Sequence, residues 1–112
     1  MSQPVSPRVI RRDFMSQLLV GLKLVWPILF FLIFSMTSLG FLIALLEHWK
    51  LFEGVYFAFV SGLTIGYGDF TPKKTAGRAI AIALGFLGIL FTALVAAIAV
   101  QAFNNTERTY NL

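Results

Sequence analysis

Two long apolar runs, with a shorter one between them, set the pattern of this chain. Residues 24–46 are 23 in a row without a charged side chain, and residues 79–100 are another 22. A helix needs about 20 apolar residues to cross the hydrocarbon of a bilayer. The pattern therefore predicts two transmembrane helices, an outer helix over 24–46 and an inner helix over 76–103.

The run between them, residues 51–63, is too short for a full crossing. As a helix, its 13 residues would extend over about 20 Å. A segment of this length is typical of a re-entrant helix, which enters the bilayer and turns back. Irregular backbone after such a helix is tolerated at membrane depth only where protein or water surrounds it. We therefore expect a pore helix over 51–63, with the negative end of its dipole toward the membrane centre, where it favours a cation.

The segment 1–23 precedes the first crossing and is expected to be cytoplasmic. Residues 1–10 are polar, contain two prolines and are expected to lack fixed structure. Residues 11–23 allow two interpretations: a short helix in the membrane interface, or simply the cytoplasmic end of the first crossing. The interfacial helix is suggested by three apolar residues at four-residue spacing, which share one helical face: Phe14, Leu18 and Leu22.

The polar residues 101–112 are expected to leave the bilayer as a frayed helix end, with 104–112 as a cytoplasmic tail. Two full crossings place both termini on the same side of the membrane. Basic residues favour the cytoplasm, and the terminal segments carry five of them against four in the central segment. That count is nearly even, but three arginines before the first crossing favour cytoplasmic termini: Arg8, Arg11 and Arg12.

Residues 64–69, the filter segment, have an unusual composition for a loop: Thr-Ile-Gly-Tyr-Gly-Asp. Glycine has no Cβ and adopts positive φ at little steric cost. Alternating ordinary and glycine-type dihedrals can turn successive carbonyls toward the same side of an extended strand. The side chains of Ile65 and Tyr67 would then pack behind this row of oxygens, and the Thr64 hydroxyl could extend it.

One such strand cannot surround an ion, but four copies around an axis can. Rings of backbone carbonyls then replace the hydration shell of K⁺, so a homotetramer is part of the hypothesis. We expect Thr64, Ile65, Gly66, Tyr67 and Gly68 to form the ion-binding stretch. The alternative is that Gly-Tyr-Gly-Asp forms an ordinary turn. The position of the segment between a short apolar helix and a second crossing favours the filter.

Composition supports a chain that folds in the lipid bilayer. It is 58% hydrophobic and 12% charged, which lies outside the usual range of soluble domains. It has no cysteine and a single histidine, His48, so no thiol-based metal site or histidine pair can form within one chain. The net charge of +4 comes from residues near the membrane ends and does not indicate nucleic-acid binding. We expect no enzymatic activity, and no cofactor other than the permeant K⁺.

Small residues in both crossings indicate close helix contacts. Gly40 marks a place where a neighbouring helix could approach the outer helix. In the inner helix, Gly88, Thr92 and Ala96 follow at four-residue spacing and share one face. That face either lines the inner pore, where small or hydroxyl side chains leave room for water, or packs against another helix.

This order of elements, with Thr-Ile-Gly-Tyr-Gly-Asp-Phe between them, resembles the two-transmembrane potassium channel pore module over residues 24–103. The resemblance implies a tetramer in which K⁺ binds the main-chain carbonyls of Thr64, Ile65, Gly66 and Tyr67, and the Thr64 hydroxyl. It also implies an inner-helix gating hinge at Gly88, cavity-lining positions at Thr92 and Ala96, and an outer mouth held by Asp69.

The chain departs from the family pattern at two positions. Leu63 stands where a second threonine is common, and Val60 stands where some bacterial relatives have a glutamate that pairs with the aspartate. Tyr56 could instead donate a hydrogen bond to Asp69. A related non-selective cation channel has aspartate where this chain has Tyr67, which favours K⁺ selectivity here.

The function expected from the sequence is passive K⁺ conduction across a membrane. The resemblance to the channel family implies the cell membrane of a prokaryote. The alternatives are a weakly selective cation channel, a pore module cut from a larger gated channel, and a non-conducting membrane scaffold or accessory subunit. No arginine-repeat helix that would sense voltage is present, and the gating stimulus is not assigned.

Overall fold

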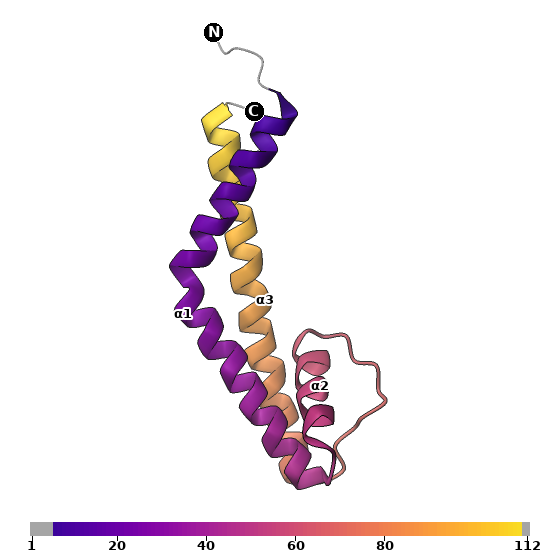
Figure 1. Ribbon diagram of the computed structural model, residues 1–112. Helices are drawn as coiled ribbons and strands as arrows, with labels where there is room; N and C mark the ends of the chain where they lie inside the picture. Colours follow the sequence, from indigo (N-terminus) through magenta and orange to yellow (C-terminus); the bar gives the residue numbers. More distant parts are fainter. Residues whose placement is uncertain (1–5, 111–112) are drawn as a thin grey trace. The chain divides into compact units, whose positions relative to one another are not determined.

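The computed structural model describes residues 6–110, which form three helices and no strand (Figure 1). The long helices are α1 (Pro7–Glu47) and α3 (Thr75–Tyr110), and the short helix α2 (Leu51–Gly62) lies between them in the sequence. Both long helices are long and apolar enough to cross a membrane. The predicted all-α fold, with two spanning helices and a short helix between them, is confirmed.

The chain divides into two compact units. The first, the pore unit, is Ile28–Ala93 and contains the second half of α1, α2, the filter segment and the first half of α3. The second, the helix-pair unit, contains the described residues up to Pro27 and from Leu94 onward. Within α1 the division falls next to Pro27, a residue that lacks the N–H needed for the regular helical bond.

Helix α1 begins earlier than its apolar run. Proline is favoured in the first turn of a helix, since its missing N–H has no intrahelical partner there, and Pro7 takes this place. The main-chain oxygen of Ser6 accepts bonds from the N–H groups of Val9 and Ile10 at 3.0 and 3.2 Å. The expectation that residues 1–10 lack structure is therefore wrong from Pro7 onward, and residues 1–5 lie outside the described part. Residues 11–23 belong to the same helix as the crossing. This is the arrangement expected if they are the end of the first crossing rather than a separate interfacial helix.

In the helix-pair unit, the start of α1 packs antiparallel to the end of α3. Asn105 Nδ2 donates to Gln17 Oε1 at 3.3 Å, and the Tyr110 hydroxyl donates to Asp13. The expected fraying of residues 101–112 is wrong as far as Tyr110, because these bonds join the last turns of α3 to α1. The start of α1 and the end of α3 therefore lie side by side in this unit.

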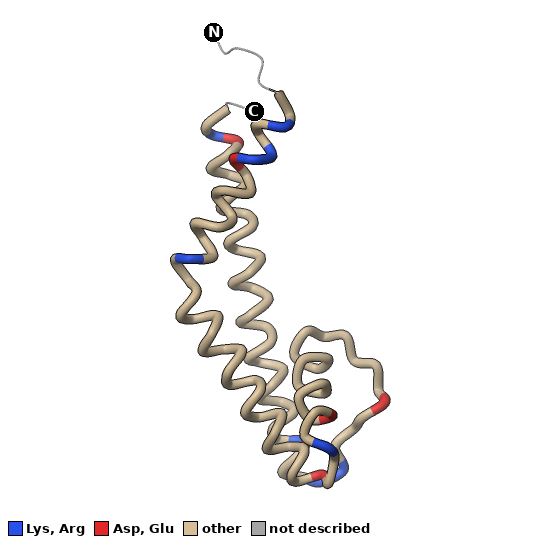
Figure 2. Tube along the Cα trace, in the orientation of Figure 1, with Lys and Arg blue, Asp and Glu red and all other residues tan. Residues whose placement is uncertain are grey.

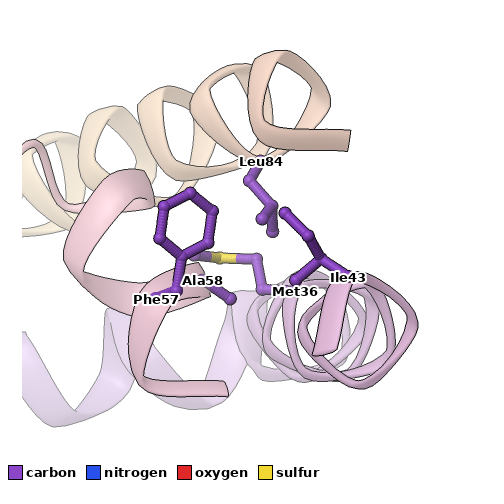
Figure 3. Close-up of a cluster of buried hydrophobic side chains, with 5 residues drawn as sticks. All are labelled: Met36, Ile43, Phe57, Ala58 and Leu84. Atoms are coloured by element: carbon purple, nitrogen blue, oxygen red, sulfur yellow. The ribbon is translucent and has the colours of Figure 1, made fainter. Parts of the chain in front are cut away.

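The pore unit has a small core to which all three helices contribute (Figure 3). Met36 and Ile43 come from α1, Phe57 and Ala58 from α2, and Leu84 from α3. Since lipid is itself apolar, such contacts stabilise the fold by close packing rather than by leaving water. A Cβ at Gly40 would lie 2.8 Å from the Gly54 main-chain oxygen. The close approach predicted at Gly40 is confirmed, and the neighbouring helix is α2.

Charged residues lie outside the apolar runs of both long helices (Figure 2). In α1, no charge occurs between Lys23 and Glu47, and in α3 none occurs between Arg78 and Glu107. Desolvating a charge at mid-bilayer is costly, so this pattern suits helices surrounded by hydrocarbon.

Candidate functional site

The filter segment starts at the C-terminal end of α2, where the helix leaves carbonyl groups without intrahelical partners. The Val60 carbonyl accepts hydrogen bonds from the N–H groups of Ile65 at 2.9 Å and Gly66 at 3.2 Å. The N–H of Thr64 donates to the Ser61 carbonyl at 3.2 Å. The inner half of the filter segment is thus fixed directly to the last turn of the pore helix.

Positive φ angles recur at every second residue of the filter segment. Thr64 has φ +61°, Gly66 +60° and Gly68 +80°, whereas Ile65 and Tyr67 between them do not have positive φ. This is the alternation of glycine-type and ordinary dihedrals that the sequence suggests for a strand with carbonyls along one side. The structure extends it to Thr64, a residue whose Cβ makes positive φ unfavourable.

Thr64 is held in this conformation by local bonds. Its hydroxyl donates to the Leu63 carbonyl at 2.6 Å, and the hydroxyl oxygen keeps lone pairs with which it can accept or coordinate. The left-handed region costs a residue with a side chain about 1–2 kcal/mol. The sequence indicated the hydroxyl as a ligand but gave no signal for the strained backbone.

Aromatic side chains support the outer half of the filter segment. The Tyr56 hydroxyl donates to Asp69 Oδ2 at 3.0 Å, so the bond suggested from the sequence is present. The Tyr56 and Tyr67 rings are stacked, with centroids 6.5 Å apart and planes 9° apart. Tyr67 therefore packs on α2 along one face, although 68% of its surface is exposed in a single chain. Ile65, which was expected to pack behind the carbonyl row, is 49% exposed in the single chain.

Trp49 and Phe70 continue this aromatic layer beyond the filter segment. The Trp49 ring meets both Phe57 and Phe70 edge-on, with centroid distances of 5.3 Å in each case. Edge-to-face pairs of this kind each contribute about 0.5–1.5 kcal/mol beyond their buried area. The layer joins the residue that follows the filter segment to α2 and to the turn between α1 and α2.

Glu47, which follows the uncharged run of α1, holds the return of the chain toward α3. Its Oε1 accepts the Lys73 N–H at 2.8 Å and its Oε2 accepts the Lys74 N–H at 3.0 Å. The pKa of Glu47 is lowered, mainly by the hydrogen bond from the Lys73 N–H, and loss of hydration opposes this with a smaller effect. The hydrogen bond from Lys74 and the positive charges of Lys74 and Arg78 lower the pKa further. Nothing in the sequence pattern pointed to this contact, because it joins residues about 26 positions apart.

The remaining predicted site residues lie along α3. Gly88 is buried against α2, whereas Thr92 and Ala96 are exposed in the single chain. The hinge role of Gly88 and the cavity-lining role of the other two stay predictions. His48 is exposed, and no group of three or more metal-binding side chains occurs among residues 6–110.

Comparison with known proteins identifies a family for this chain. A family model described as an ion channel matches residues 26–105, which include α2 and the filter segment. The "Putative potassium channel protein YugO" of Bacillus subtilis is 38% identical over 60 residues, which are 53% of this chain and 18% of that protein. The "Probable potassium channel protein 2" of Methanocaldococcus jannaschii is 37% identical over 50 residues, which are 45% of this chain and 15% of that protein.

The similarity to these two relatives covers less than a fifth of their own length. No solved structure matches the chain. The family model, however, matches most of the chain, and its members are ion channels rather than a known class of enzyme. With two apolar helices long enough to cross a bilayer, the chain is a membrane protein and belongs to the ion channel family.

Proposed function

We propose that four copies of this chain form a potassium-selective channel, which conducts K⁺ passively through a pore lined by backbone carbonyls. The alternation of positive φ at Thr64, Gly66 and Gly68 carries the proposal. Such an alternation can turn successive carbonyls of the filter segment toward one side, which would provide a row of oxygen ligands without any charged side chain. Rings of such oxygens are the ligands that replace the hydration shell of K⁺.

Three further observations support conduction of a cation. The C-terminal end of α2 adjoins the filter segment, so the negative end of the helix dipole faces the ion path. The filter segment is exposed in the single chain, which leaves it accessible to ions and to neighbouring subunits. Both relatives reported above are named as potassium channel proteins.

We place the start of α1 and the end of α3 in the cytoplasm. Arg8, Arg11 and Arg12 cluster at this end of the helix pair, and basic residues near spans favour the cytoplasmic side. The relatives come from a bacterium and an archaeon, which supports a prokaryotic cell membrane.

The proposal is tested by reversal potentials of the purified protein in planar bilayers with mixed K⁺ and Na⁺ solutions. The reversal potential of a K⁺-selective pore shifts by about 59 mV for each tenfold change of the K⁺ gradient, which is the factor for one elementary charge. A potential that ignores the K⁺ gradient would contradict K⁺ selectivity, and a partial shift would favour the weakly selective alternative.

The role of the filter segment is tested by Gly66→Ala, with Gly85→Ala as the matched control. Alanine at Gly66 must adopt φ +60°, a conformation that costs about 1–2 kcal/mol per chain. A Cβ at Gly85 meets nothing within 4 Å. We expect Gly66→Ala to reduce K⁺ flux into liposomes by about tenfold or more, and Gly85→Ala to leave it unchanged. A flux in Gly66→Ala equal to that of wild type would contradict the role of the filter segment, and no K⁺ flux in the wild type would favour a non-conducting scaffold.

A further inference from the structure

Helix α2 is held between α1 and α3 by two contacts made by glycines. Gly40 of α1 faces Gly54 of α2, and Gly62, the last residue of α2, faces Gly88 of α3. All four glycines are buried. At both places the helix backbones touch directly, without a side chain between them.

A methyl group at either contact would collide with main-chain atoms. A Cβ at Gly88 would overlap the carbonyl group and Cα of Gly62. A Cβ at Gly40 would lie 2.8 Å from the Gly54 oxygen and 2.9 Å from the Val55 Cα. Main-chain atoms of a helix cannot rotate aside as a side chain can, so α2 itself would have to move.

Movement at Gly62 would be transmitted to the ion-binding stretch. Gly62 is two residues before Thr64, and Val60 in the same helical turn accepts the N–H groups of Ile65 and Gly66. A site that must match the size of a bare ion tolerates displacements of only about 0.5 Å.

We propose that Gly88 and Gly62 are positioning residues for ion selectivity. Their backbone contact sets the distance between α2 and α3, and through Val60 it sets the geometry of the inner half of the filter segment. This inference rests on the proposed K⁺ conduction and gives Gly88 a role separate from a hinge. A hinge requires a flexible backbone at this position, whereas the contact requires the absence of a side chain.

Gly88→Ala and Gly85→Ala separate the two roles. Both replace a glycine in α3 by alanine and stiffen the helix equally, but only Gly88→Ala introduces a collision. The measurement is the K⁺ to Na⁺ permeability ratio from reversal potentials of single open channels. This ratio is independent of the number of channels and of the fraction of time they are open.

We expect the ratio to fall by about tenfold in Gly88→Ala and to stay within about twofold of wild type in Gly85→Ala. An unchanged ratio in Gly88→Ala, with only the open time altered, would overturn the proposal and favour the hinge. The same fall in both variants would also overturn it, because a Cβ at Gly85 would meet no neighbouring atom within 4 Å.

A second pair of variants applies if Gly88→Ala does not assemble. A Cβ at Gly62 would collide with the end of the Met36 side chain, while the Leu84 oxygen lies at 3.4 Å. Met36→Leu removes the colliding methyl at nearly constant volume. We expect Gly62→Ala to lower the ratio by less than Gly88→Ala would, and Met36→Leu to restore it. A fall in Gly62→Ala that Met36→Leu does not restore would overturn the proposal, because the loss would then not come from crowding against α2.

The wild-type protein distinguishes failure of this inference from failure of the proposed function. A wild-type ratio near one would reject K⁺ selectivity itself. A selective wild type with an equally selective Gly88→Ala would reject only the positioning role.

Discussion

A hydrogen bond from Tyr56 to Asp69 joins the pore helix to the outer end of the filter segment. Asp69 is exposed and Tyr56 is partly buried, so water competes for the bond. Hydrogen bonds to charged groups are stronger than neutral ones when they are shielded from water, and the exposure of Asp69 weakens this one.

We expect Tyr56→Phe to shorten the conducting bursts of single channels by about fivefold. Phenylalanine keeps the ring that stacks on Tyr67 and removes only the hydroxyl. The measurement is a double-mutant cycle with Asp69→Ala, in which the coupling between the two residues is read from burst durations. Purely additive effects would show that the bond does not stabilise the conducting filter.

At the residue scale, the sequence indicates those features that depend on residue type alone. Positive φ at Gly66 and Gly68 follows from the lack of a Cβ. Positive φ at Thr64 could not be predicted, because a β-branched residue avoids this region unless surrounding bonds impose it. The contact of Gly88 with Gly62 also escapes prediction, since it depends on the register between two helices that are separated in the chain.

At the scale of helices, the sequence located all three but misplaced the ends of the long ones. Loss of apolar character marks where a helix leaves the hydrocarbon, and the helix itself continues into the polar region. Thus α1 starts at Pro7 and α3 ends at Tyr110, because bonds between their polar ends replace contacts with lipid. The short α2 ends within one residue of the expected 51–63, since the glycine-rich filter segment stops it.

Glu47 connects the end of α1 to the start of α3, and this contact should make stability depend on pH. Its pKa in the folded chain lies below the ordinary value of 4.5. A carboxylate of lowered pKa contributes stability that is fully present above the ordinary value and is lost as the pH falls through the folded-state value. The window therefore begins near pH 4.5 and extends downward.

We expect Glu47→Gln to lower the thermal unfolding temperature of the detergent-solubilised protein at neutral pH, because the uncharged amide has a single oxygen and can accept only one of the Lys73 and Lys74 N–H groups. The variant should also lose less stability than wild type between pH 5 and pH 3, about the range that spans the window. The measurement is the unfolding temperature as a function of pH. Parallel curves for the two proteins would show that Glu47 does not titrate in this contact.

At the scale of the whole molecule, one chain leaves its central feature incomplete. In the proposed channel a single filter segment would provide oxygens on one side of an ion only. Ile65, which was expected to pack behind the carbonyl row, is half exposed in the single chain. Four chains around an axis would complete the ion cage and cover Ile65 with a neighbouring subunit. Bound K⁺ would then join the subunits, because carbonyl groups that face one another across the axis repel when no cation lies between them.

We therefore expect the solubilised protein to be a tetramer whose stability depends on K⁺. A ligand that binds only the assembled state stabilises it by about 2.7 kcal/mol when its concentration is a hundred times the dissociation constant. Replacing K⁺ by Na⁺ at constant ionic strength should lower the temperature at which tetramers dissociate, measured by native mass spectrometry or gel electrophoresis after heating. Gly66→Ala should reduce this difference, because it distorts the ligand row, whereas Gly85→Ala should preserve it. A tetramer equally stable in both salts would mean that the filter segment does not hold K⁺ between the subunits.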